Sequence, residues 1–143
     1  MAELRSLVLV LGDQLDLEAA AFDGVERQLD AVWMAEVVDE STHVWPRTVM
    51  FLAAMRHFAL ALQSASRPLH YTRLDAPDNR GSLAEQLRCD IERLRPTRLV
   101  MTAPGDWRVL QALKTVAEAC AVPLEVREDR HFFVSVREFA AHA

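Results

Sequence analysis

The chain alternates between short, continuous apolar runs and longer stretches in which apolar residues recur every three or four positions. The runs predict buried strands, and the stretches predict amphipathic helices. The predicted strands cover 7–11, 31–37, 69–73, 98–102 and 123–127, and the predicted helices cover 48–65, 82–94 and 106–120, with a short last helix from Ser135. Because strands alternate with helices, we expect a Rossmann-like, three-layer α/β/α fold with a five-stranded, mostly parallel sheet, and residues 1–143 as a single domain.

The first apolar run ends in a polar turn, Gly12-Asp13-Gln14-Leu15. A run that is apolar at every position is typical of a strand buried on both faces, and open α/β sheets bind ligands beyond the carboxyl ends of such strands. Gly12 would let the backbone approach a bound molecule, while Asp13 and Gln14 would bring hydrogen-bonding groups to that edge. The alternative is an ordinary turn that needs only a flexible glycine and a helix cap.

A group of carboxylates, Glu36, Asp39 and Glu40, stands at the end of the second predicted strand. If the first two strands are neighbours, these acids lie beside residues 12–15 at the carboxyl edge of the sheet. Carboxylates accept hydrogen bonds from ring N–H and hydroxyl groups, so the edge suits a neutral heterocycle or a polyol better than a phosphate. The alternative is that the acids are solvated and only cap a loop.

The helix predicted at 48–65 is apolar on nearly every side, because only Arg56 and His57 are polar between Val49 and Leu62. A helix of this kind is normally buried on more than one side, whereas a small sheet covers only one. We therefore expect it to pack against another domain or against a second copy of the chain in a homo-oligomer. The alternative is an outer face that is merely rich in alanine.

Charge and composition exclude several functions. The net charge is −5 and the 16 Lys and Arg residues are scattered, so we expect no direct nucleic-acid binding. The sequence has no phosphate-cradling glycine motif, no nucleophile elbow and no metal-ligand spacing of its two cysteines and five histidines. It also has no signal peptide and no apolar stretch long enough to span a bilayer, so we predict a cytoplasmic protein without membrane contact.

Seven short segments stand in one order along the chain: Leu9–Leu15, Met34–Val37 with Glu40, Ala54–Phe58, Asp78–Ser82, Pro104–Arg108, Arg127–Phe132 and Arg137–Ala141. Together they resemble the prokaryotic iron–sulfur photolyases and cryptochromes, the deoxyribodipyrimidine photolyase-related proteins. In that family such a segment is the N-terminal α/β domain. A large helical domain follows it and holds FAD, a four-cysteine [4Fe–4S] cluster and the DNA-binding surface.

The resemblance implies that this chain is the antenna domain of such a protein. Family members bind 6,7-dimethyl-8-ribityllumazine in this domain, and the lumazine passes excitation energy to the flavin. The implied partner is the C-terminal FAD-binding helical domain. FAD and the [4Fe–4S] cluster are expected only there, because two unclustered cysteines cannot supply four thiolate ligands.

The lumazine-binding residues that the resemblance implies are Gly12, Asp13, Gln14, Leu15, Ala35, Glu36, Glu40 and Phe51. The loop would face the ring or the ribityl chain, Glu40 would accept hydrogen bonds, and Phe51 would line the pocket. No catalytic residue and no metal ligand is expected, because an antenna needs neither acid, base nor nucleophile. The alternatives are a module that binds another small molecule, or a scaffold that docks a partner through helix 48–65 and Trp107.

Overall fold

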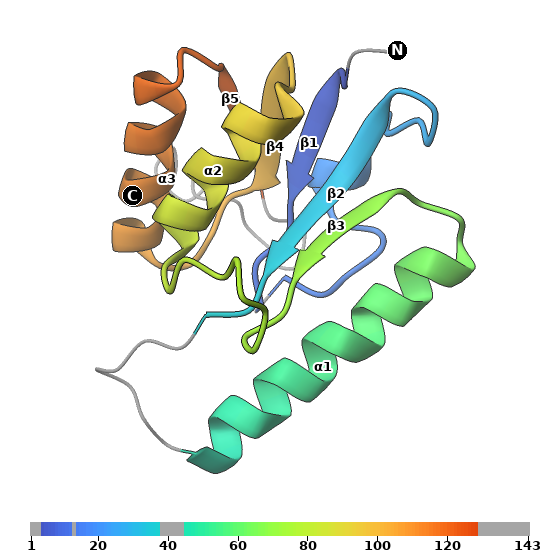
Figure 1. Cartoon of the computed structure of the whole chain (residues 1–143). Coiled ribbons are helices and arrows are strands. Elements are labelled where there is room, and N and C mark those ends of the chain that lie inside the picture. Colours follow the sequence, from blue (N-terminus) through green and yellow to red (C-terminus); the bar gives the residue numbers. More distant parts are fainter. Residues whose placement is uncertain (1–3, 13, 38–44, 129–143) are drawn as a thin grey trace, which may run out of the picture.

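The structure is a computed structural model that describes residues 4–12, 14–37 and 45–128, without the side chains of residues 45–48 and 51. Five strands form one sheet in the order β3-β2-β1-β4-β5, and every neighbouring pair is parallel (Figure 1). The strands are β1 (Ser6–Leu9), β2 (Asp30–Ala35), β3 (Leu69–Thr72), β4 (Arg98–Thr102) and β5 (Leu124–Arg127). The helices are α1 (Trp45–Ser64), α2 (Leu83–Leu94) and α3 (Trp107–Ala119), and a 3₁₀ turn, η1 (Ala20–Phe22), stands between β1 and β2.

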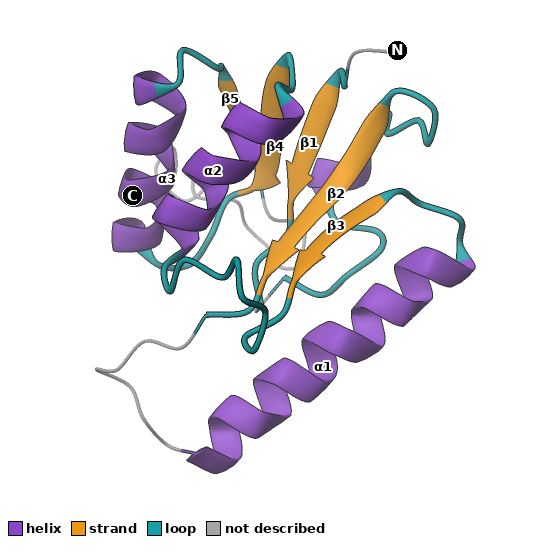
Figure 2. Cartoon of the chain, in the orientation of Figure 1, coloured by secondary structure: helices purple, strands orange, loops and turns teal. Residues whose placement is uncertain are grey.

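Helices cover both faces of the sheet, which produces three layers (Figure 2). Successive side chains of a strand point to opposite faces. Val8 and Val32 therefore pack with α1 and η1, whereas Leu9 and Trp33 pack with α2 and α3. The predicted Rossmann-like α/β fold is confirmed, and the sheet of the described residues is wholly parallel. That residues 1–143 form a single domain stays a prediction.

The predicted strands at 7–11 and 31–37 are shorter in the structure, where they end at Leu9 and Ala35. Val10 and Leu11 are nevertheless buried, with 3% and 6% of their surface exposed. The apolar run therefore reflects burial beyond the end of the strand as well as the strand itself. The helix expected from residue 48 begins earlier, at Trp45, and the last helix, expected from Ser135, lies outside the described residues.

Side-chain caps stand at the start of α2 and of α3. The Ser82 hydroxyl accepts a hydrogen bond from the Glu85 N–H at 3.2 Å at the start of α2, and the Asp106 carboxylate accepts one from the Arg108 N–H at 2.8 Å at the start of α3. Side-chain acceptors at these positions satisfy N–H groups that have no partner within the helix. The caps fix where the two helices begin, at Leu83 and at Trp107.

α1 exposes large apolar side chains on its outer face, as its sequence predicts. Val49, Met50 and Leu60 have 58%, 72% and 60% of their surface exposed. Trp107, at the start of α3, is 68% exposed, so local packing does not account for this residue. Whether α1 packs against a domain or a second copy stays a prediction.

Within the described ranges, no helix has the length and apolar character needed to cross a bilayer, and the cytoplasmic location stays a prediction.

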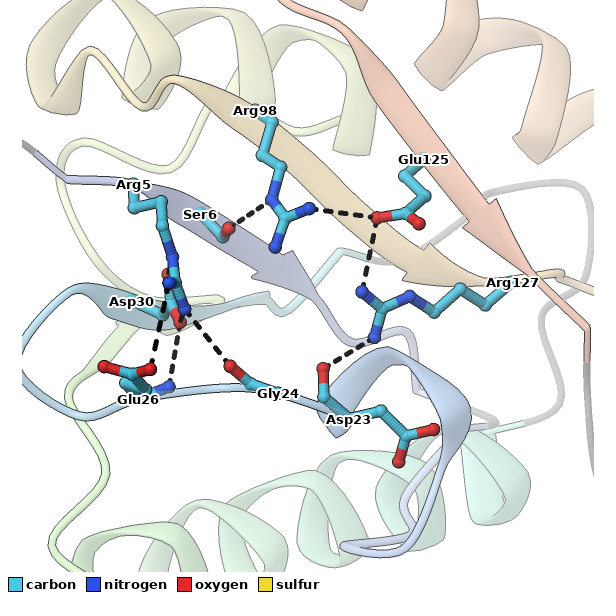
Figure 3. A network of polar contacts seen from close by, with 9 residues as sticks. All are labelled: Arg5, Ser6, Asp23, Gly24, Glu26, Asp30, Arg98, Glu125 and Arg127. Carbon is cyan, nitrogen blue, oxygen red and sulfur yellow. Dashed lines mark hydrogen bonds and ion pairs between the residues drawn. The ribbon is translucent and has the colours of Figure 1, made fainter.

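A polar network attaches the connection between β1 and β2 to the sheet (Figure 3). The Arg5 guanidinium donates to the buried Asp30 carboxylate, with Nε and Oδ1 3.0 Å apart, and to the Gly24 carbonyl at 3.1 Å. From β5, Arg127 donates to the Ala20 and Asp23 carbonyls, both at 2.8 Å. These bonds hold η1 against the face of the sheet that α1 also covers.

Candidate functional site

The loop after β1 and the end of β2 meet at one edge of the sheet. The two strands are parallel neighbours, with Leu9 paired to Trp33, so their carboxyl ends point the same way. The expectation that the first two strands are neighbours is therefore confirmed. β2 and β3 lie on one side of β1 in the sheet, and β4 and β5 lie on the other side. The carboxyl end of β1, next to β4, is therefore a topological switch point. Open α/β sheets bind their ligands at such points.

Gln14 fastens the loop across this switch point. Its side-chain amide donates to the Thr102 carbonyl at the end of β4, with Nε2 and O 2.9 Å apart, and its backbone N–H donates to the Leu11 carbonyl at 2.9 Å. The Thr102 hydroxyl in turn accepts from the Ala21 N–H at 3.2 Å. The loop is therefore held to β4 and, through β4, to η1. Sequence reasoning missed Thr102, and the only signal for it is a polar residue that ends the apolar run of β4.

Ala35 and Glu36, two of the predicted lumazine-binding residues, point to opposite faces of the sheet. The Ala35 side chain is 4% exposed and packs in the core beneath α2 and α3 together with Trp33. The Glu36 side chain lies on the α1 face, where Arg56 binds it. The structure therefore does not bring these two side chains into one pocket, although their backbones lie at the same edge.

The Glu36 carboxylate is fully buried and accepts four hydrogen bonds. Arg56 of α1 donates two of them, from Nε at 2.8 Å and from Nη2 at 2.9 Å. The Tyr71 hydroxyl of β3 donates a third, and the Leu74 N–H donates the fourth at 2.9 Å. The Glu36 backbone carbonyl also accepts from the Asn79 side chain at 2.8 Å. One residue thus connects β2, α1, β3 and the segment that follows β3.

The electrostatics of this cluster favour the ionised carboxylate. Burial alone would raise the pKa of Glu36, but the hydrogen bonds from Arg56, Tyr71 and the Leu74 N–H outweigh it and lower the pKa to about 2. Burial and the bond to Glu36 raise the pKa of Tyr71, so its phenol remains protonated and keeps donating. Glu36 is therefore charged and paired throughout the physiological pH range.

The structure describes only some of the remaining residues predicted to bind lumazine. Gly12 and Leu15 are half-buried at the edge, and Leu15 packs against the core on the α1 side. Phe51 lies in α1, but the structure does not describe its side chain. Asp13 and Glu40 lie outside the described residues. The proposed roles of these eight residues therefore stay predictions.

A hollow of about 620 Å³ opens at the same edge on the opposite face, between the first turns of α2 and α3. Its walls are mainly apolar, and Asp106 and Arg108 stand among them. It is lined by Val37, Gly81, Ser82, Leu83, Ala84, Asp106, Arg108, Val109, Ala112 and Leu113. Among residues 4–12, 14–37 and 45–128, no group of three or more His, Cys, Asp or Glu side chains is placed to hold a metal ion.

The parallel sheet and the loop pinned across its switch point define a Rossmann-like α/β protein with a carboxyl edge of the kind that binds ligands. The chain belongs to the deoxyribodipyrimidine photo-lyase-related protein family, whose sequence model matches residues 8–143. It is 37% identical over 139 residues to a (6-4) photolyase of Agrobacterium fabrum (strain C58 / ATCC 33970). That match covers 95% of this chain and 27% of the relative, so the chain corresponds to a small part of it. The family resemblance expected from the sequence is confirmed.

Proposed function

We propose that this chain is the antenna domain of a photolyase-related protein and binds 6,7-dimethyl-8-ribityllumazine at the carboxyl edge of the sheet, on the α1 side. The observation that carries the proposal is the family match over residues 8–143 in a chain that spans only 27% of a photolyase relative. The lumazine would absorb blue light and pass the excitation to a flavin. FAD and the [4Fe–4S] cluster would belong to a C-terminal helical domain in the rest of the longer protein.

The geometry of the edge supports this proposal. Energy transfer needs a chromophore at a fixed position, and the edge is braced by the bond from Gln14 to Thr102 and by the bonds around Glu36. The lumazine carries ring carbonyls, ring nitrogens and hydroxyls but no phosphate, which fits a site built from amide and carboxylate groups. Leu15 offers an apolar surface to the ring. Gln14 would bind the lumazine through its side-chain carbonyl, and Glu40 through its carboxylate.

The outer face of α1 supports the second part of the proposal, which is that the C-terminal helical domain packs there. Val49, Met50 and Leu60 present an exposed apolar surface, and α1 contains no Asp, Glu or Lys. Because the photolyase relative extends far beyond the matched part, another domain of the same protein is available as the occupant. A second copy is the weaker choice, because a stable dimer buries roughly 800 Å² per partner, whereas a domain of the same chain is held close by its linker.

Titration of 6,7-dimethyl-8-ribityllumazine with the purified chain tests the function, with ligand fluorescence anisotropy as the readout. We expect saturable binding, and we expect Glu40→Ala to weaken it by about 1–3 kcal/mol through the loss of a buried polar contact. Ala112→Trp is the matched control, because it fills the hollow between α2 and α3 and leaves the α1 side intact. Absence of binding to a folded chain would contradict a site contained within these residues.

The hollow supports a second candidate, a module that binds a different small molecule there. Its volume of about 620 Å³ lies within the range of small-molecule pockets. Thermal-shift screening of small metabolites against the chain and against Ala112→Trp distinguishes the two candidates. A ligand that stabilises the unmodified chain but not Ala112→Trp supports the second function, whereas lumazine binding that persists in Ala112→Trp supports the first.

A further inference from the structure

We infer that Glu36 is a positioning residue that anchors α1 to the carboxyl edge of the sheet and is not itself a ligand contact. The inference rests on the proposed lumazine site, because α1 supplies one wall of that site. It also changes the role that the sequence resemblance implies for Glu36, which is direct contact with the chromophore.

The hydrogen-bonding capacity of the Glu36 carboxylate is fully used. A carboxylate offers about four acceptor positions, and four donors occupy them: two N–H groups of Arg56, the Tyr71 hydroxyl and the Leu74 N–H. The side chain has no exposed surface. A ligand could bind it only by displacing one of these donors, which would leave a buried polar group without a partner.

The anchor lies where the buried apolar packing of α1 begins. Among the side chains of α1 that the structure describes, Met55, Phe58, Ala59 and Leu62 are buried, whereas Val49 and Met50 are exposed. Figure 1 shows the first turns of α1 extending past the ends of β2 and β3. The salt bridge from Arg56 to Glu36 therefore holds α1 to the sheet near the middle of the helix, at the point from which these first turns extend.

Phe51 stands five residues before Arg56 in α1, which corresponds to about 7.5 Å along the helix axis. Movement of the anchor would therefore move the turn that carries Phe51 relative to the edge.

Three of the segments that carry the family resemblance meet at this anchor. Glu36 belongs to Met34–Val37, Arg56 belongs to Ala54–Phe58, and Asn79, which donates to the Glu36 carbonyl at 2.8 Å, belongs to Asp78–Ser82. These segments are far apart in the sequence, and their side chains come together only through the fold. A shared positioning task gives a physical reason for their joint occurrence in this chain.

Hydrogen–deuterium exchange, measured without ligand, tests the anchor directly. In Glu36→Gln we expect exchange of residues 49–58 to rise at least tenfold, while α3 stays unchanged. Tyr71→Phe keeps the Arg56 bonds, so its effect should have the same location and a smaller size. Glu85→Gln is the matched control, because it neutralises an acid in an exposed ion pair with Arg88. Unchanged exchange of α1 in both cluster variants would overturn the inference.

Lumazine affinity of the same variants separates positioning from contact. We expect Glu36→Gln to bind lumazine at least tenfold more weakly. Tyr71→Phe should lose less affinity, in line with its smaller rise in hydrogen–deuterium exchange. Loss of affinity without faster exchange of α1 would make Glu36 a direct contact and overturn the inference, as would faster exchange without loss of affinity. If the unmodified chain binds no lumazine, the proposed function fails, and the exchange pattern still decides whether Glu36 anchors α1.

Discussion

Replacement of Glu36 by glutamine should remove a pH-dependent part of the stability of this protein. The pKa of this carboxyl falls from 4.5 to about 2 on folding, because bonds from Arg56, Tyr71 and the Leu74 N–H outweigh the effect of burial. The difference corresponds to about 3 kcal/mol. Because the folded-state pKa is the lower one, this stabilisation is complete above the unfolded pKa and is lost as the pH falls from about 5 to 2.

Urea unfolding at pH 7 and pH 3, followed by circular dichroism, measures this contribution. We expect Glu36→Gln to lower the free energy of unfolding by about 3 kcal/mol at pH 7, because it breaks a buried ion pair. At pH 3 the gap to the unmodified chain should shrink by about 2 kcal/mol, since most of the titration of the unfolded carboxyl is then complete. Other acids, such as Asp30, titrate in both proteins and cancel from the comparison.

Glu85→Gln provides the control for this experiment. Glu85 is 55% exposed in its ion pair with Arg88, so its replacement should change the free energy of unfolding by less than about 1 kcal/mol at either pH. If the gap between Glu36→Gln and the unmodified chain is the same at pH 7 and pH 3, the buried carboxylate is not the source of the acid sensitivity and the reasoning is refuted.

Three further substitutions test the fold and the edge. Asp90→Ala should lower the free energy of unfolding by about 2–3 kcal/mol in urea titrations, because it leaves the buried Trp33 indole N–H without its acceptor at 2.8 Å; a loss below 0.5 kcal/mol would contradict this. Gln14→Ala should cost about 1 kcal/mol through the lost bond to Thr102 and should weaken lumazine binding in the anisotropy assay, and equal affinity would show that the brace is not needed. Leu60→Gln should change the thermal midpoint of this chain by no more than about 2 °C, because Leu60 is 60% exposed. A larger drop would show that Leu60 is packed within the folded chain and is not part of an open surface.

The sequence predicts the strands, their mostly parallel arrangement and the edge where polar residues collect, because these features depend on local patterns. It does not show which face of the sheet each residue of β2 takes. Both faces of this strand are buried, so its residues are apolar almost throughout and the alternation is hidden. The family resemblance placed Ala35 and Glu36 in one site, but consecutive residues at a strand end point to opposite faces, and their side chains do so here.

The bonds that brace the edge could not be predicted because they connect residues far apart in the chain. Gln14 and Thr102 are 88 positions apart, and Glu36 is 20 positions from Arg56 and 35 from Tyr71. A carboxylate at a strand end has the same sequence signal whether it faces a ligand or a buried arginine. Only the packing of α1 against the sheet distinguishes the two cases.

The location of the lumazine site tests the central claim most directly. Two-dimensional ¹H–¹⁵N NMR of the labelled chain, recorded during a titration with 6,7-dimethyl-8-ribityllumazine, reports the backbone amides that the ligand affects. We predict saturable shifts at Gly12, Gln14 and Leu15 and none at Val109 and Ala112, which line the hollow on the other face. Shifts confined to Val109 and Ala112, or no shifts in a folded chain, would contradict a lumazine antenna site on the α1 side of this edge.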